Sequence, residues 1–129
     1  MIDLHMHSRY SEDGEFTPFE LVRQCDKKGI RIMSVTDHNC AKANDEAAET
    51  AKKNGITYIP GIEIDCIFRD TNFHLLGYGI DFWSSDFGDI EKKIGSQSLQ
   101  ASLERLAATQ KLGFGHVAEK DMRTLAKGS

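Results

Sequence analysis

Side chains that commonly bind metal ions recur along residues 1–74 of this 129-residue sequence. Imidazole nitrogens combined with carboxylate oxygens suit zinc, manganese or iron, whereas thiolate cages and all-oxygen calcium sites use other donor sets. A carboxylate placed between two such ions belongs to the arrangement that activates water and holds a phosphoryl group. The candidate metal ligands are His5, His7, Asp13, His38, Glu63 and His74.

Four apolar segments of the sequence predict β-strands. They cover residues 2–7, 30–36, 56–64 and 73–80. The first segment alternates apolar and polar residues, whereas the second is apolar enough to be buried on both faces, as in a parallel sheet. Pro60 and Gly61 interrupt the third segment.

The segments between and after these strands predict helices. Thr17 and Glu20 form a capping-box pattern around Pro18, which fits the first helical turn. The other helical segments are 41–54, 84–112 and a short one at 118–126, and Gly29 and Gly55 are predicted helix stops. The order strand, helix, strand, helix, strand, strand, helices predicts an α/β fold with a largely parallel sheet.

The candidate ligands concentrate at strand ends. His5 and His7 close the first strand, and residues two apart in a strand project from the same face. His38 follows the second strand and Glu63 lies in the third, at the edge where parallel α/β folds form their ligand crevice. His74 opens the fourth strand instead, which fits if that strand runs antiparallel or follows a tight hairpin. One His-x-His pair arises readily by chance, but this clustering favours a shared metal site.

Three further residues have candidate supporting roles. Asp3 and Asp37 are predicted to orient the ligating imidazoles by accepting hydrogen bonds from their other N–H groups. Arg9 is predicted to hold a substrate phosphate, although an exposed loop arginine often has no such role.

The composition limits the classes of partner. The formal net charge of −4 argues against a basic surface that coats nucleic acid, while bound cations would make an acidic site locally positive. The sequence has no secretory-signal pattern at its start and no apolar run approaching the roughly 20 residues of a membrane span. The three cysteines form no paired spacing and are expected to be free thiols. We therefore expect a cytoplasmic protein without membrane partners.

Five short segments, taken together, resemble the opening motifs of the PHP family, named for polymerase and histidinol phosphatase. They are Asp3-Leu4-His5-Met6-His7-Ser8, Ser11-Glu12-Asp13-Gly14, Thr36-Asp37-His38, Gly61-Ile62-Glu63-Ile64 and His74-Leu75-Leu76-Gly77-Tyr78. The motifs occur in the family's order over about residues 1 to 80. The resemblance implies a distorted seven-stranded (β/α) barrel with two or three divalent ions (Mn, Zn or Fe) at the carboxyl ends of its strands.

The same resemblance implies a role for each ligand. His5 and His7 would bind one metal ion, Asp13 and His38 a second, Glu63 would bridge, and His74 would bind a third. Either Glu12 or Asp13 could be the loop ligand, and Asp13 is preferred because it directly precedes Gly14, as in the family pattern.

The resemblance also predicts domains and activity. Residues 1–83 would form the first half of the barrel, and 84–129 are similar to the start of a small inserted domain in stand-alone bacterial members. That group contains nucleoside 3′,5′-bisphosphate phosphatases and 5′-to-3′ exoribonucleases. We expect a phosphoesterase that hydrolyses phosphate monoesters or nucleotide ends with metal-activated water.

The family pattern continues with a further His and an Asp-x-His pair that this sequence does not match. We therefore expect either a fragment of a longer protein or an incomplete site, and self-association through an exposed sheet edge. Two alternative functions are an inactive metal-binding module and a PHP domain associated with a DNA polymerase. The acidic charge and the helical insert weigh against the polymerase.

Overall fold

A computed structural model describes residues 1–113 of the chain. Two compact units are present, one comprising Met1–Glu91 and a second that begins at Lys92. All strands and all six candidate ligands belong to the first unit. The helix expected at 118–126 lies outside the described residues, and the assignment of 84–129 to an inserted domain stays a prediction.

Three short parallel strands form the first sheet, in the order β1 (Ile2–Asp3), β2 (Ile32–Met33) and β3 (Thr57–Tyr58). The regular strands are shorter than the apolar segments that predict them. Main-chain pairing nevertheless continues past β1, because the Thr36 amide donates to the Met6 carbonyl at 2.8 Å. The segment that leads to His7 is therefore held beside the end of β2.

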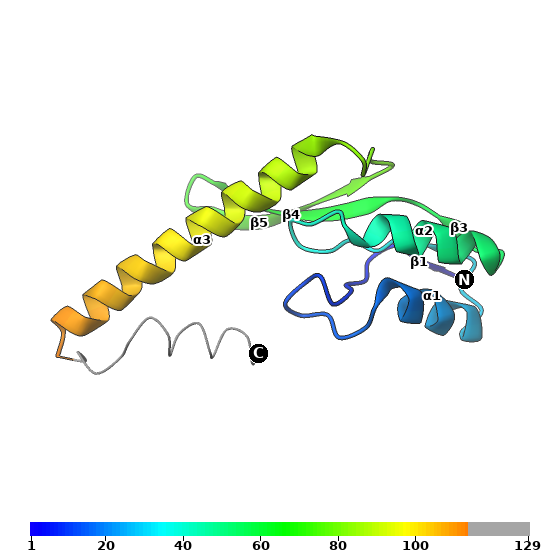
Figure 1. Cartoon of the computed structure of the whole chain (residues 1–129), viewed down its shortest axis with the longest axis horizontal. Coiled ribbons are helices and arrows are strands. Elements are labelled where there is room, and N and C mark those ends of the chain that lie inside the picture. Colours follow the sequence, from blue (N-terminus) through cyan, green and yellow to red (C-terminus); the bar gives the residue numbers. More distant parts are fainter. Residues whose placement is uncertain (114–129) are drawn as a thin grey trace. The chain divides into compact units, whose positions relative to one another are not determined.

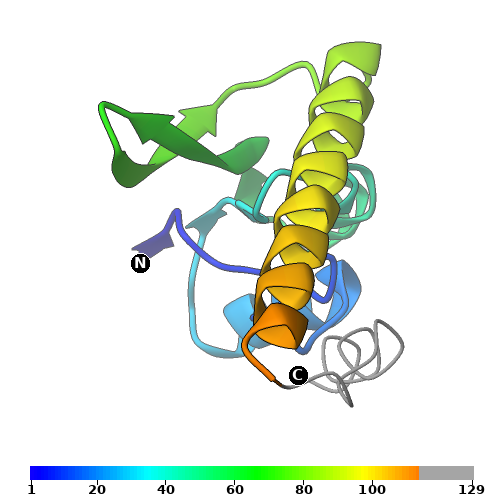
Figure 2. The ribbon, with the colours of Figure 1, turned by 90° about the vertical axis from the view of Figure 1, so that its left-hand side faces the viewer.

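Helices α1 (Pro18–Lys27) and α2 (Ala43–Lys53) lie side by side over this sheet (Figures 1 and 2). The predicted capping box is confirmed: the Glu20 amide donates to Thr17 Oγ1 at 3.1 Å, and the Thr17 amide donates to Glu20 Oε2 at 2.8 Å. Apolar side chains from both helices and the strands form one core, made of Leu21, Val22, Cys25, Ile30, Met33, Val35, Ala43, Ala47, Ala51 and Ile56.

The third predicted strand is divided in two at Pro60. Its second part is β4 (Gly61–Phe68), which pairs antiparallel with β5 (Thr71–Tyr78) in a hairpin. The antiparallel direction that would explain the position of His74 is thus present, and His74 pairs with Asp65 in the register. A parallel bridge between His38 and Glu63 joins the end of β2 to this hairpin.

The buried side chain of Asn44 on α2 fixes the start of β4. Its Oδ1 accepts hydrogen bonds from the Tyr58 hydroxyl at 2.6 Å and from the Gly61 amide at 3.0 Å. Its Nδ2 donates to the Gly61 carbonyl at 3.0 Å. Because Glu63 follows Gly61 by two residues, these bonds help to set the position of Glu63.

A long helix, α3 (Ser85–Lys111), follows the hairpin and crosses the boundary between the two units. It agrees with the helix predicted over 84–112. Within residues 1–113, no helix combines the length and apolar character that a membrane crossing requires.

Candidate metal centre

The loop between β1 and α1 is fixed by the fully buried carboxylate of Asp37. This carboxylate accepts hydrogen bonds from the Ser8 amide and hydroxyl, both at 2.6 Å, and from the Ser11 hydroxyl at 3.0 Å. Ser11 Oγ in turn accepts from the His38 amide at 2.8 Å. A Cβ at Gly14 would collide with the Ser8 carbonyl oxygen, so the close approach of the loop requires glycine there.

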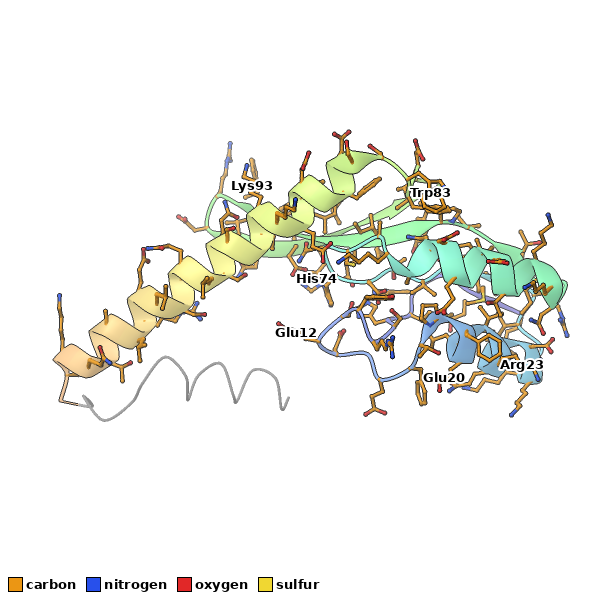
Figure 3. All side chains as sticks on the ribbon, viewed as in Figure 1. Glu12, Glu20, Arg23, His74, Trp83 and Lys93 are labelled. Atoms are coloured by element: carbon orange, nitrogen blue, oxygen red, sulfur yellow. The ribbon has the colours of Figure 1, made fainter. Side chains whose placement is uncertain are left out.

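Glu63 lies at the centre of the candidate site, and its side chain is only 4% exposed. Its Oε2 is 3.2 Å from His5 Nε2, 2.8 Å from His7 Nε2 and 3.7 Å from His38 Nε2. Its Oε1 is 3.0 Å from His74 Nδ1. Four imidazoles from three segments of the chain therefore face one buried carboxylate, and Figure 3 shows His74 reaching from the hairpin into this region.

The four rings also contact one another in a row. The ring centroids are 5.2 Å apart for His5 and His7, 4.5 Å for His7 and His38, and 5.1 Å for His38 and His74. Unprotonated imidazoles in such a row offer several nitrogen lone pairs to cations in the same region.

Asp13 is the loop carboxylate that reaches the histidines. Its Oδ1 and Oδ2 lie 2.8 and 2.9 Å from His7 Nδ1, and Oδ2 is 3.3 Å from His38 Nε2. Glu12 is exposed at the tip of the loop (Figure 3). The geometry thus favours Asp13, the residue preferred from the sequence.

The hairpin is tied to the segment that carries the first two histidines. The Tyr78 hydroxyl donates a hydrogen bond to the Leu4 carbonyl at 2.7 Å. Burial and the nearby charges of Glu63 and Asp3 raise the pKa of Tyr78, which keeps this donor protonated. The bond holds His74 and His5 on the same side of the first unit.

The charges of the cluster alter the ionisation of its members. Burial opposes ionisation of Glu63 and Asp13, but the neighbouring histidines outweigh it and lower the pKa of both carboxyls. Burial also opposes protonation of His38, yet the hydrogen bond to Asp65 and the charges of Asp65, Glu63 and Asp13 raise the pKa of His38. The site is therefore an anionic centre that attracts cations.

The residues fit a divalent metal ion. His7 Nε2 lies 2.8 Å from Glu63 Oε2. It is nevertheless one of two buried side-chain nitrogen or oxygen atoms in the described part of the chain that have no hydrogen-bond partner. A buried nitrogen without a partner is costly unless a ligand uses its lone pair. Three groups of donor atoms also lie within 4.8 Å of one another: His5, His7 and Glu63; His7, Asp13 and His38; and His38, Asp65 and His74.

Asp3 and Asp37, which were predicted to orient imidazole rings, form hydrogen bonds with other groups. Asp3 accepts a hydrogen bond from the His5 backbone amide at 3.2 Å, and Asp37 binds Ser8 and Ser11 as described above. These bonds hold the backbone and the loop, not the imidazole rings. Arg9 is exposed, and its amide donates to the Phe16 carbonyl at 2.8 Å.

Asp65 faces the cluster and was not identified from the sequence. Its Oδ1 is 3.0 Å from His38 Nδ1 and 3.3 Å from His74 Nε2. The available signal was its position two residues after Glu63 in a strand, which places both carboxylates on the same face.

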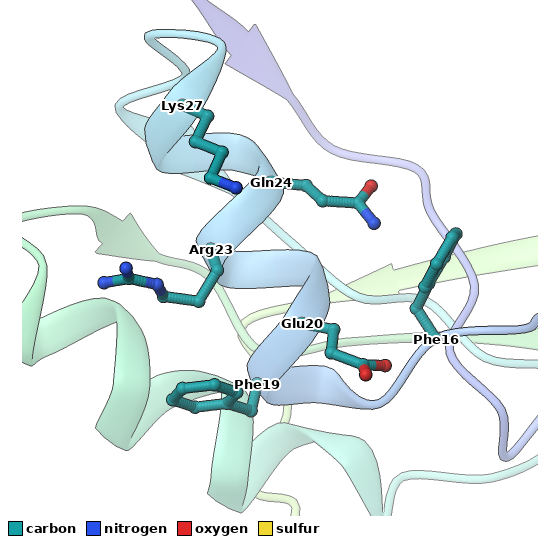
Figure 4. A pocket seen from close by; sticks show the side chains of 6 residues that line it. All are labelled: Phe16, Phe19, Glu20, Arg23, Gln24 and Lys27. Carbon is teal, nitrogen blue, oxygen red and sulfur yellow. The ribbon is translucent and has the colours of Figure 1, made fainter.

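A separate pocket lies on the outer face of α1 and does not involve the histidines. It is lined by Phe16, Phe19, Glu20, Arg23, Gln24 and Lys27 (Figure 4). Glu20 is already used by the capping box. None of the lining residues belongs to the candidate metal centre.

The PHP domain family model matches residues 3–121 of the chain. The chain belongs to the PHP domain family. Two solved structures share its fold. An amidohydrolase from Chromobacterium violaceum, with bound sulfate and no metal, superposes with a TM-score of 0.73 at 31% identity, over 87% of this chain and 39% of that one. A protein from Bifidobacterium adolescentis described as a metal-dependent phosphoesterase gives 0.70 at 28% identity, over 82% and 38%.

Two relatives of this PHP domain are named as a phosphatase and an exoribonuclease. The chain is 38% identical over 80 residues to a 3′,5′-nucleoside bisphosphate phosphatase from Chromobacterium violaceum, covering 62% of this chain and 28% of that protein. It is 37% identical over 79 residues to a 5′-3′ exoribonuclease from Haemophilus influenzae, covering 61% and 28%. The chain thus spans a little over a quarter of the length of these relatives.

Proposed function

We propose that this chain carries the metal centre of a phosphoesterase that hydrolyses phosphate monoesters or nucleotide ends. The observation that carries the proposal is Glu63, a buried carboxylate faced by four imidazoles, one of which has a nitrogen without a hydrogen-bond partner. Such a set of nitrogen and oxygen donors suits manganese, zinc or iron.

The proposed ligand assignment uses two or three ions. His5 and His7 hold one ion, Asp13 and His38 a second, Glu63 lies between them, and His74 holds a third. Three groups of donor atoms support more than one ion: His5 and His7 lie close to Glu63, Asp13 and His38 lie close to each other and to His7, and His74 lies close to His38. Bound divalent ions would supply water activation and neutralise charge on the phosphoryl oxygens.

The side chains of the chain itself hold the charges in place. The lowered pKa values of Glu63 and Asp13 keep both carboxylates ionised near neutral pH, so they offset the charge of bound cations. Asp37 fixes the loop of Asp13 through Ser8 and Ser11. Arg9 lies in that same loop, and we propose that its exposed guanidinium binds a phosphate oxygen of the substrate.

The proposed substrate class rests on the relatives. Two of them are named as a nucleoside bisphosphate phosphatase and an exoribonuclease, and both names describe hydrolysis of phosphate esters of nucleotides. Sulfate, which is bound in the structure from Chromobacterium violaceum, is a tetrahedral anion with the shape of phosphate.

Metal analysis together with phosphate release tests the proposal. Protein purified without chelator should contain at least one equivalent of transition metal and should release phosphate from p-nitrophenyl phosphate or a nucleoside 3′,5′-bisphosphate when Mn²⁺ is added. EDTA should abolish the release. A chain that takes up neither Mn²⁺ nor Zn²⁺ would overturn the metal centre, whereas uptake without hydrolysis would favour an inactive metal-binding module.

We also propose self-association through the hairpin. β5 is an edge strand of the two-stranded sheet, and Phe68, Phe73 and Leu75 are exposed on the face opposite Glu63. Edge strands and exposed apolar side chains both favour pairing between chains. Light scattering should find dimers or larger species whose mass falls in the Leu75→Lys variant; a monomer at all concentrations would contradict the proposal.

A further inference from the structure

Asp65 stands opposite His74 in the hairpin and on the same face as Glu63. One of its oxygens, Oδ1, meets two imidazoles from different segments. It lies 3.0 Å from Nδ1 of His38 and 3.3 Å from Nε2 of His74. Asp65 therefore contacts one histidine in the segment after β2 and another in the middle of β5.

Asn39 holds the other oxygen of Asp65. Its Nδ2 donates to Asp65 Oδ2 at 2.9 Å, and its Oδ1 accepts from the Asp65 amide at 2.8 Å. The Asn39 amide donates to the Glu63 carbonyl at 2.7 Å. Asn39 has a φ of +54°, a left-handed conformation that asparagine tolerates better than most residues. These bonds leave Oδ1 available to the rings.

The contact with Asp65 favours one tautomer of each neutral ring. An ionised carboxylate only accepts hydrogen bonds, so a neutral His38 that donates to Asp65 has its proton on Nδ1, and a neutral His74 oriented by Asp65 has its proton on Nε2. The other ring nitrogens then have free lone pairs. His38 Nε2 is 3.3 Å from Asp13 Oδ2 and 3.7 Å from Glu63 Oε2, and His74 Nδ1 is 3.0 Å from Glu63 Oε1. Both lone pairs therefore face carboxylate oxygens of the proposed metal ligands.

Lone pairs directed at a carboxylate repel it unless a cation lies in the same region. On the basis of the metal centre proposed above, we propose that Asp65 is a positioning residue that fixes the tautomers of His38 and His74 for metal binding. Carboxylates that accept the second N–H of a ligating histidine have this effect in metal sites. Asp3 and Asp37, which the sequence suggested for this role, bind the His5 backbone and the serines of the first loop instead.

The tautomers can be measured directly in the ¹⁵N-labelled full chain. Long-range ¹H–¹⁵N correlation spectra of the zinc-loaded chain should show the proton on Nδ1 of His38 and on Nε2 of His74. In Asp65→Ala both assignments should change or average, and zinc affinity should fall by roughly 10- to 100-fold. The number of zinc ions bound at saturation should stay the same, because a positioning residue donates no ligand atom.

Two further variants separate orientation from folding. Asn39→Ala removes the hydrogen bonds that hold Asp65 but keeps its carboxylate. This variant should also lower zinc affinity, by a smaller factor than Asp65→Ala does. Asp86→Asn, an exposed site at the start of α3, serves as the matched control and should leave tautomers and affinity unchanged. Circular dichroism of each variant establishes that the chain is folded.

The outcomes distinguish the two proposals. If the unaltered chain binds zinc but His38 carries its proton on Nε2, or if Asp65→Ala keeps full affinity, the positioning role is wrong. Loss of one zinc equivalent in Asp65→Ala would make Asp65 a ligand and would also overturn it. Failure of the unaltered chain to bind zinc would overturn the metal centre, while the tautomers of the metal-free chain would still test Asp65.

Discussion

His7 Nε2 lies 2.8 Å from Glu63 Oε2, but the two atoms are not arranged as donor and acceptor of a hydrogen bond. The other nitrogen of the same ring meets Asp13 at 2.8 Å. A neutral His7 ring that donates a hydrogen bond from Nδ1 to Asp13 has a lone pair on Nε2. This lone pair faces the lone pairs of Glu63. A cation shared by His7 and Glu63 would remove this repulsion and use both groups.

Glu63→Gln tests the central carboxylate. The substitution keeps the shape of the side chain and removes its charge, so cations held by the histidines would repel one another more strongly. We expect the loss of at least one metal equivalent by elemental analysis, with an unchanged circular dichroism spectrum. Glu49→Gln, an exposed site on α2, is the matched control. Unchanged metal content in Glu63→Gln would contradict the bridging role.

Glu12 and Asp13 can be separated by a pair of variants with equivalent chemistry. Asp13→Asn removes a carboxylate that contacts His7 and His38, whereas Glu12→Gln changes an exposed neighbour. We expect Mn²⁺ affinity to fall by at least tenfold in Asp13→Asn and to stay within twofold in Glu12→Gln. Isothermal titration calorimetry measures both. The reverse order of affinities would make Glu12 the loop ligand.

The helices and the ligand positions follow from local sequence signals. The capping box of Thr17 and Glu20 needs only four consecutive residues to be recognised, and the structure contains it. The alternation of His5 and His7 likewise depends only on strand geometry. By contrast, the lengths of the parallel strands depend on which segments pair, and for this reason residues 2–7 predict a longer strand than Ile2–Asp3.

The role of Asp65 depends on contacts that the sequence does not indicate. An aspartate in a strand suggests a solvent-facing residue, because the sequence allows an antiparallel return of β5 but does not give the register that brings His74 opposite Asp65. The same limit applies to Asp37. Its place beside His38 suggested an imidazole partner, but the loop after β1 folds back and supplies Ser8 and Ser11 first.

The stability of the metal-free chain should depend on pH in both directions. The pKa of His38 in the folded chain is raised above the ordinary value of 6.5. Protonated His38 therefore stabilises the folded chain fully below pH 6.5, and this stabilisation is lost as the pH rises through the folded-state pKa. The pKa values of Asp13 and Glu63 are lowered from 3.8 and 4.5, so their contributions exist above those values and are lost as the pH falls through the folded-state pKa values. Thermal melting in EDTA should be highest between about pH 4.5 and 6.5.

The metal-loaded chain should behave differently on the alkaline side. Metal ions require unprotonated imidazoles, so added Zn²⁺ should raise the melting temperature more at pH 8 than at pH 5.5. In the metal-free chain, His38→Asn should reduce the fall in melting temperature that occurs as the pH rises above about 6.5. A melting temperature in EDTA that keeps rising to pH 8 would show that His38 does not control this decline.

Asn44→Ala tests how the fold positions the site. The variant leaves the Gly61 amide and carbonyl and the Tyr58 hydroxyl without their partner, and unsatisfied buried polar groups cost about 1–3 kcal/mol each. We expect urea unfolding, followed by circular dichroism, to show a free energy of unfolding lower by at least about 1 kcal/mol. Asn72→Ala, an exposed site on β5, should change it by less than about 0.5 kcal/mol. Because Gly61 begins the strand that carries Glu63, metal affinity should fall in Asn44→Ala even where the variant remains folded. Parent-like stability together with parent-like metal affinity would show that the start of β4 is held by other contacts.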